Sequence, residues 1–337
     1  MSKLSRREFL KRAIISGAAT ATILSSTAKY SEAAAKNIEY GTLIDLTKCN
    51  GCTHLKIPAC VSACKAENSF KFPKPIESKK ILNYWPHDKK EDWSAKKNLI
   101  DRLTPYNWIF LQKTTVNHNG KEHELFIPRR CMHCDNPPCA HLCPFGAQSK
   151  KPNGAVIIDH SFCFGGAKCR DVCMWNIPAR QAGVGLYLKI APKYAGGGVM
   201  YKCDLCYHRI ENGKTPACVE SCPTSALQFG EKNKIKQLAY SISKKINGYV
   251  YGDKEHGGTS TFYVSQVPFE KINQKLAEQK AVQPNPNIPG YPLMPVSEKN
   301  ILDTPNGLAY SMLLASVAGL ALAGFTAYKT MKNGGDE

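Results

Sequence analysis

The sequence predicts an α+β fold of two similar small modules, followed by a single C-terminal transmembrane helix. Three observations support this prediction: fifteen cysteines in four tight groups, short β-type runs beside those groups, and an uncharged run near the end of the 337-residue chain. Similar phrases around the cysteines, such as Pro58-Ala-Cys60 and Pro216-Ala-Cys218, indicate that one structural unit is duplicated.

The cysteines give the most specific signal. Each complete group reads C-x2-C, a variable gap, then C-x3-C. The complete groups are Cys49, Cys52, Cys60 and Cys64; Cys131, Cys134, Cys139 and Cys143; and Cys203, Cys206, Cys218 and Cys222. The third group along the chain has only Cys163, Cys169 and Cys173, with Gly166 where a fourth cysteine would stand. This is the ferredoxin ligand run, in which three thiolates hold one iron–sulfur cluster and the fourth reaches a neighbouring cluster. The modules are therefore predicted to be two ferredoxin-like dicluster modules, with four clusters in all.

Disulfides and zinc are the alternative uses of these cysteines. Exported proteins usually pair their cysteines, but fifteen is an odd number and the C-x2-C spacing is cramped for a structural bridge. Zinc ribbons also use paired C-x2-C, yet they do not normally come as four groups that end in C-x3-C. Iron–sulfur ligation explains the pattern best, and metal coordination should supply much of the folding free energy of these loops.

Residues 1–35 have the pattern of a twin-arginine export signal. Arg6 and Arg7 precede a mildly apolar stretch, and residues 33–35 form an A-x-A type cleavage site. A basic amphipathic helix is the alternative, but the stretch is rich in Ala, Ser and Thr and has no charged face. This export route carries folded cargo, so clusters inserted in the cytoplasm would cross with the protein.

Residues 308–328 form an uncharged run that is long enough for one helix to cross a hydrocarbon core of about 30 Å. A buried core helix is the alternative. Lys329 and Lys332 follow the run, so the positive-inside rule puts the C-terminus in the cytoplasm. The predicted location is the cytoplasmic membrane, with a single pass and the cysteine-rich body on the periplasmic side. Small residues at every fourth position of the run suit packing against a membrane partner.

Between these ends, residues 36–248 are expected to form the four-cluster ferredoxin-like domain, and residues 249–307 an extension with a Pro-rich tether. Strands are expected at 41–46, 155–159, 226–229 and 259–267, and a helix at 231–246. Residues 283–295 hold five prolines and are expected to be an extended tether to the membrane helix.

An insert, residues 65–130, joins the first two cysteine groups and is too long for a plain loop. Its aromatic residues include Tyr84, Trp85, Trp93, Tyr106 and Trp108. They either pack over the clusters or meet a partner, and packing is favoured because buried aromatics are commoner than exposed anchors.

The formal charge of +18 does not indicate a nucleic-acid-binding protein. Cleavage of the predicted signal removes a net charge of about +4, and each oxidised cluster with its thiolates carries about −2. The mature protein is then only moderately basic, at about +6. No nucleic-acid reader motif is recognisable in the sequence, so no nucleic-acid partner is expected.

The arrangement as a whole resembles a known family. The leader, the cysteine groups, the insert before Arg130-Cys131-Met132-His133-Cys134 and the terminal anchor resemble the membrane-anchored four-cluster ferredoxin subunits of periplasmic respiratory enzymes. Phrases such as Leu103-Thr-Pro-Tyr106 and Gly257-Gly-Thr259 make the chain similar to the HybA-like iron–sulfur subunits of uptake nickel–iron hydrogenases. The β subunits of membrane-bound formate dehydrogenases share the same plan.

The resemblance implies which cysteines would share each cluster. Cluster A would take Cys49, Cys52, Cys60 and Cys222; cluster B, Cys131, Cys134, Cys139 and Cys173; cluster C, Cys163, Cys169 and Cys143; and cluster D, Cys203, Cys206, Cys218 and Cys64. Because Gly166 stands at the empty corner of cluster C, three 4Fe–4S clusters and one 3Fe–4S cluster are expected. A water, Lys168 or Asp171 capping a fourth iron is the alternative, which would give four 4Fe–4S clusters. Thr53–Ala59 widens the usual gap before Cys60.

The resemblance also implies a non-catalytic electron-transfer subunit. It would relay electrons between a periplasmic catalytic subunit, a nickel–iron hydrogenase, and a quinone-reactive integral membrane subunit. A formate dehydrogenase or a molybdopterin sulfur-compound reductase is the alternative catalytic partner.

Two other classes of function explain the sequence less well. An enzyme in its own right is disfavoured because no open metal site, flavin fingerprint or nucleophile constellation is recognisable. A structural or assembly protein would not need four cluster-binding groups. His54, His133 and His141 lie among the cysteines and are expected to be hydrogen-bonding residues, not additional ligands.

Overall fold

The computed structural model describes residues 38–83, 89–190, 192–193, 197–283, 289–296, 298–305 and 307. The chain divides into two units, 1–38 and 39–337, and the second holds every described residue except Ile38. The predicted signal at 1–35 and the predicted transmembrane helix at 308–328 lie outside the described residues. Among the residues that are described, no helix combines the length and apolar character needed to cross a membrane.

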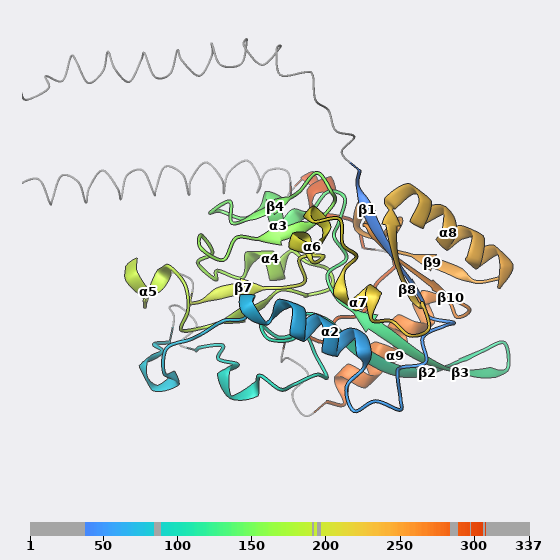
Figure 1. The fold of residues 1–337 in the computed structure, drawn as a ribbon, viewed down its shortest axis with the longest axis horizontal. Coiled ribbons are helices and arrows are strands. Elements are labelled where there is room, and N and C mark those ends of the chain that lie inside the picture. Colours follow the sequence, from blue (N-terminus) through green and yellow to red (C-terminus); the bar gives the residue numbers. More distant parts are fainter. Residues whose placement is uncertain are drawn as a thin grey trace, which may run out of the picture. The chain divides into compact units, whose positions relative to one another are not determined.

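A four-stranded sheet joins the two ends of the cysteine-rich region (Figure 1). Its order is β8 (Leu227–Glu231), β1 (Tyr40–Asp45), β10 (Thr261–Ser265) and β9 (Tyr249–Tyr251). β1 runs antiparallel to β8 and parallel to β10, and β9 is antiparallel to β10. Leu43, Phe262 and Val264 pack against Ile235 and Ala239 of helix α8 (Lys232–Lys245), because those two residues share one face of the helix. The strand before the first cysteine group therefore lies beside the strand after the last one.

The strands and the helix expected from the sequence are present within two residues of their predicted bounds. They are β1, β5 (Val156–Ile158), β8, β10 and α8. Two short hairpins separate the later cysteine groups. They are formed by β4 (Gln148–Lys150) with β5, and by β6 (Ala179–Gln181) with β7 (Val199–Tyr201). The α+β prediction is confirmed by these elements.

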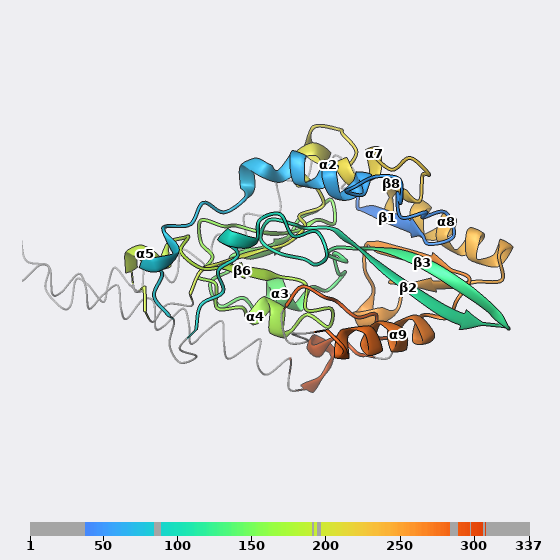
Figure 2. The same cartoon turned by 90° about the horizontal axis from the view of Figure 1, so that it is seen from below.

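Short helices carry or adjoin the C-x3-C halves of the cysteine groups. They are α2 (Ala59–Asn68), α3 (Pro138–His141), α4 (Lys168–Asp171) and α7 (Ala217–Glu220). α2 packs on α7, and α3 packs on α4 (Figure 2). The first cysteine group therefore meets the last, and the second meets the third. The remaining helices are α5 (Tyr187–Ile190), α6 (Tyr207–Glu211), α9 (Phe269–Ala281) and the 3₁₀ turns Ser69–Lys71, Ser78–Lys80, Ser94–Lys96, Glu255–Gly257 and Ile301–Asp303.

The insert contains a long hairpin that the sequence analysis did not predict. β2 (Phe110–His118) and β3 (Lys121–Arg129) pair antiparallel, and Asn119 and Gly120 form the turn with positive φ angles of 51° and 72°. Trp93, Tyr106 and Trp108 are buried, so the preference for packing over partner contact is confirmed for these three residues. Tyr84 and Trp85 lie outside the described residues.

The described part of the Pro-rich segment is extended but packs on the body, which the prediction of a tether did not include. The Gly290 carbonyl accepts a hydrogen bond of 2.8 Å from the Leu103 N–H, and the Leu293 carbonyl accepts one of 2.7 Å from Arg129 Nη2. Met294 is fully buried. These contacts fix residues 289–296 to the insert and its hairpin.

Candidate iron–sulfur sites

The four cysteine groups begin with the same backbone turn. The residue two positions after the first cysteine has a left-handed conformation in every group: Gly51 (φ 70°), His133 (52°), Gly165 (68°) and Leu205 (61°). In three groups the N–H of this residue hydrogen-bonds the thiol of the first cysteine, as the Leu205 N–H does with Cys203 Sγ at 3.4 Å. The incomplete third group therefore folds like the others.

Glycine is needed at the first of these turns for a second reason. A Cβ on Gly51 would lie 2.4 Å from the ring of Phe126, in β3 of the insert. The insert hairpin therefore presses directly on the loop of the first cysteine group.

Two sets of four cysteines each surround a cavity. Cys64, Cys203, Cys206 and Cys218 line one cavity together with Asn68 and Arg130. Cys131, Cys134, Cys139 and Cys173 line the other together with Trp175 and Lys202. These are the sets that the family resemblance assigns to clusters D and B, and we call them sites D and B.

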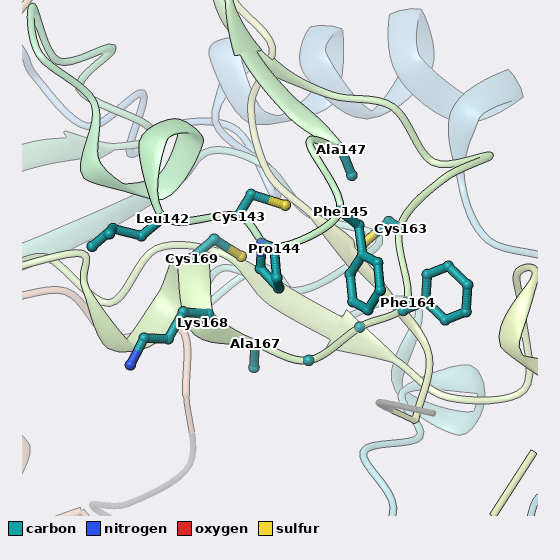
Figure 3. Close-up of a pocket in the computed structure, with 12 residues that line it drawn as sticks. Leu142, Cys143, Pro144, Phe145, Ala147, Cys163, Phe164, Ala167, Lys168 and Cys169 are labelled. Atoms are coloured by element: carbon teal, nitrogen blue, oxygen red, sulfur yellow. The ribbon is translucent and has the colours of Figure 1, made fainter. Parts of the chain in front are cut away.

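Three cysteines surround a larger cavity of about 290 Å³, which we call site C. Cys143, Cys163 and Cys169 gather around this space, and the rings of Phe145 and Phe164 stack at 4.4 Å on its wall (Figure 3). Gly166 also lines the cavity, where the complete groups have a cysteine.

The backbone does not require glycine at position 166. Its φ angle is outside the left-handed region, and a Cβ built there would meet no atom within 4 Å. A larger side chain therefore has room at this corner of site C.

The remaining cysteines, Cys49, Cys52, Cys60 and Cys222, form site A. Burial raises the pKa of Cys49 to about 11, and the nearby thiols of Cys222 and Cys52 contribute to the rise. Burial also raises the pKa of Cys60, with contributions from the thiols of Cys218, Cys49, Cys52 and Cys222. All fifteen cysteines are free thiols. Those of sites B, C and D line cavities, and those of site A lie close enough to influence one another electrostatically.

The sites are neighbours in the order A, D, B, C. Cys60 of site A and Cys218 of site D lie on the paired helices α2 and α7. Arg130 contacts both Cys203 of site D and the carbonyl of Cys131 of site B. Cys139 of site B and Cys169 of site C lie on the paired helices α3 and α4. Sites A and D share the α2–α7 pair, and sites B and C share the α3–α4 pair. Two dicluster modules therefore meet where D faces B.

The donor sets fit iron–sulfur clusters. Burial raises the pKa of Cys64, Cys134 and Cys169 well above the usual range, so a thiolate at these positions needs a cation to replace its proton. Arg130 has two buried N–H groups, at Nε and Nη2, without a hydrogen-bond acceptor in the described structure. Sulfide atoms of a cluster in site D would supply acceptors for such groups. Across the described ranges, no three His, Cys, Asp or Glu side chains converge to hold a single metal ion.

His133 is a buried hydrogen-bonding residue, as expected. Its Nδ1 accepts a hydrogen bond of 3.0 Å from the Val156 N–H, so Nε2 carries the proton and points to Cys203 Sγ at 3.7 Å. Burial, and then the charges of Lys202 and Arg130, lower the pKa of His133 well below its usual value. The imidazole is therefore neutral. His54 and His141 are exposed.

The sequence analysis missed an ion-pair network that positions site C. Glu91, in the insert, accepts hydrogen bonds of 2.7 and 2.8 Å from Arg170 of α4 and of 2.5 Å from Arg180 of β6. Arg180 also donates a hydrogen bond of 2.8 Å to the Gly165 carbonyl. One carboxylate thus ties the helix that carries Cys169 to the strand that supports the Gly165 turn.

Comparison with known proteins identifies related chains. Residues 48–147 and 123–232 both match families described as 4Fe–4S dicluster domains. A relative from Escherichia coli K12, "Probable anaerobic dimethyl sulfoxide reductase chain YnfG", is 32% identical over 59% of this chain and 77% of its own length. The iron–sulfur subunit of the nitrate-inducible formate dehydrogenase of the same strain is 32% identical over 67% of this chain and 68% of its own. The "Hydrogenase-2 operon protein HybA" of Escherichia coli O157:H7 is 28% identical over 80% and 83%.

We predict that Glu91→Gln destabilises the protein by about 3 kcal/mol at pH 7, because it leaves the buried guanidinium group of Arg180 and the partly buried one of Arg170 without their carboxylate. The pKa of Glu91 lies below its usual value: burial raises it, but the bond from Arg170 and the charge of Arg180 outweigh that effect. The stabilisation is therefore complete above about pH 4.5, the unfolded value, and is lost as pH falls through the lower folded value.

The difference in unfolding free energy between the wild type and Glu91→Gln, measured by denaturant titration, should stay constant from pH 7 to about pH 5 and shrink below that. Glu77→Gln is the matched control, because Glu77 forms an exposed ion pair with Lys80 and should change little. An equal loss in both variants would contradict the role given to Glu91.

Proposed function

The chain belongs to the family of ferredoxin-type 4Fe–4S dicluster iron–sulfur subunits of oxidoreductases, and we propose that it relays electrons from a nickel–iron hydrogenase to a quinone-reactive membrane subunit. The order of the sites, A–D–B–C, is the observation that carries the electron-relay part of this proposal. The hydrogenase is preferred as partner because the similarity to HybA extends over 80% of this chain.

Iron–sulfur clusters, when bound, supply one-electron transfer at potentials set by cluster type, charge, hydrogen bonds to sulfur and exposure. The fifteen cysteines would hold them in the sets of sites A to D. The chain's other residues keep the sites in a fixed order, exclude water from most of the thiols and donate hydrogen bonds to them. Asn68 Nδ2, for example, lies 3.7 Å from Cys64 Sγ and 4.0 Å from Cys206 Sγ.

Formate dehydrogenase and a sulfur-compound reductase are the alternative partners, because two relatives named for such enzymes are 32% identical to this chain. Purification of the full chain with its complex separates the three possibilities. We expect a nickel-containing subunit to copurify, and hydrogen to reduce the clusters within the complex. A copurified molybdopterin enzyme would instead support the alternatives, and hydrogen or formate turnover by the chain alone would overturn the electron-relay assignment.

The proposed location is the periplasmic face of the cytoplasmic membrane, with residues 1–35 as export signal and 308–328 as a single anchor whose C-terminus is cytoplasmic. The paired arginines and the uncharged run support it. Protease added to spheroplasts should digest the cysteine-rich body and spare the tail after Lys329. Replacement of Arg6 and Arg7 by lysine should leave the body protected inside, and continued export of that variant would contradict the proposal.

Three 4Fe–4S clusters and one 3Fe–4S cluster are the proposed cofactors, with the three-iron cluster in site C. Glycine offers no ligand at position 166, and the two side chains that could cap a fourth iron, Lys168 and Asp171, are both exposed. The oxidised protein should then give a near-isotropic paramagnetic resonance signal that disappears on mild reduction, with about 15 irons per chain.

Gly166→Cys tests the cofactor proposal, since a Cβ fits at that position without contact. This variant should gain about one iron per chain and lose the oxidised signal. Gly166→Ala is the matched control: its methyl group also fits but cannot bind iron, so it should behave as the wild type does. A wild type that is silent when oxidised and holds about 16 irons would show that site C carries a four-iron cluster.

A further inference from the structure

A basic residue directly precedes the first cysteine in three of the four groups. These residues are Lys48, Arg130 and Lys202. Lys48 is exposed, whereas Arg130 and Lys202 are only 2% and 5% exposed. The same position in the sequence thus holds a solvated charge in one group and a buried charge in two others.

Arg130 reaches from the second cysteine group into the site of the other module. It lines the cavity of site D, and its Nη1 lies 3.9 Å from Cys203 Sγ. The same nitrogen donates a hydrogen bond of 3.2 Å to the carbonyl of Cys131, in site B. Nε and Nη2, both buried, have no acceptor in the described structure.

Lys202 makes the reciprocal arrangement. It lines the cavity of site B, and its Nζ donates hydrogen bonds to the carbonyls of Val156 and, at 3.2 Å, of Cys203 in site D. Each cation therefore enters one site and holds the backbone of a ligand of the other. The two crossed side chains lie where the dicluster modules meet.

Within the described ranges, neither cation forms an ion pair with a carboxylate. In the described part of the chain, the acidic residues that follow them most closely in the sequence are paired with other cations. Asp204 pairs with Lys71 at 2.6 Å, and Asp135 pairs with Lys150 at 3.7 Å. A buried cation is costly unless an opposite charge compensates it. The thiolates and clusters of sites D and B are the negative groups positioned to do so.

We propose that Arg130 and Lys202 are charge-compensating residues that raise the midpoint potentials of the clusters in sites D and B. The proposal rests on the proposed function, since it requires clusters in both sites. Reduction adds one negative charge to a cluster, and a fixed positive charge in a water-poor cavity favours the reduced form. Arg130 should act mainly on the cluster in site D and Lys202 mainly on the cluster in site B. These two clusters, at the junction between the modules, should therefore be reduced more readily than they would be without the cations.

The test is a redox titration of the purified full chain with its clusters, followed by paramagnetic resonance. Arg130→Met and Lys202→Met remove the charge and keep most of the side-chain length. Each variant should lower the midpoint potential of one cluster, and the affected cluster should differ between the two variants. The expected decrease is at least 59 mV, which corresponds to a tenfold change in the equilibrium constant of a one-electron reduction. Arg130→Lys and Lys202→Arg retain the charge and should shift the same potentials less than half as far.

Lys48→Met is the matched control, because it removes the same charge from the same position of the first group but from an exposed side chain. It should leave every potential unchanged. Shifts of equal size in Lys48→Met, or iron-complete Met variants whose potentials all match the wild type, would overturn the proposal.

If a neutral variant fails to bind its cluster, its iron content is measured in place of the midpoint potential. Loss of about four irons in Lys202→Met, with full iron in Lys202→Arg, would support charge compensation. The same loss in both would overturn it, because shape and not charge would then be required. A wild type that lacks clusters altogether would refute the proposed function itself, which is a different result from unshifted potentials in an iron-complete protein.

Discussion

The burial of thiols is the constraint on which the rest of the structure depends. A thiol in an apolar surrounding stays protonated at neutral pH, so these loops gain strong internal bonds only when metal replaces the protons. Their helices are one turn to three turns long and have little core of their own. The protein therefore holds the loops from outside, through the insert hairpin against Gly51, through Glu91 beside site C, and through the sheet that joins both ends of the region.

Cysteine spacing predicted four ligand groups, whereas the assignment of cysteines to shared clusters came from the family resemblance, because the partner group of each fourth cysteine is not a local property of the sequence. The hairpin β2–β3 was missed although its signal is present: Asn119-Gly120 lies between two stretches in which apolar and polar residues partly alternate. The insert is also rich in aromatic residues, which are typical of buried segments of any secondary structure and so do not indicate a hairpin. The prolines of 283–295 indicated extended backbone, but docking of the described part depends on distant partners, such as Arg129, that no local pattern identifies.

The buried cations could not be predicted from the sequence. Lys48 and Lys202 occupy the same position in their motifs, and only the tertiary structure separates them. Lys202 is buried because the β6–β7 hairpin brings it against Val156, whereas Lys48 lies in the turn that follows β1 and its side chain is in solvent. A motif thus defines the ligands of a site, while the packing of one module on another defines the charge around it.

The parallel pairing of β1 with β10 has a consequence for the order of events during synthesis. Thr42 pairs with Thr261, so the central strand of the sheet lacks one neighbour until almost the whole body has left the ribosome. Contacts this distant in sequence form slowly because a long loop must close first. All four cysteine groups precede β10 in the sequence and are therefore synthesised before it. We therefore expect the sheet to close late in folding, after every predicted cluster ligand has been synthesised.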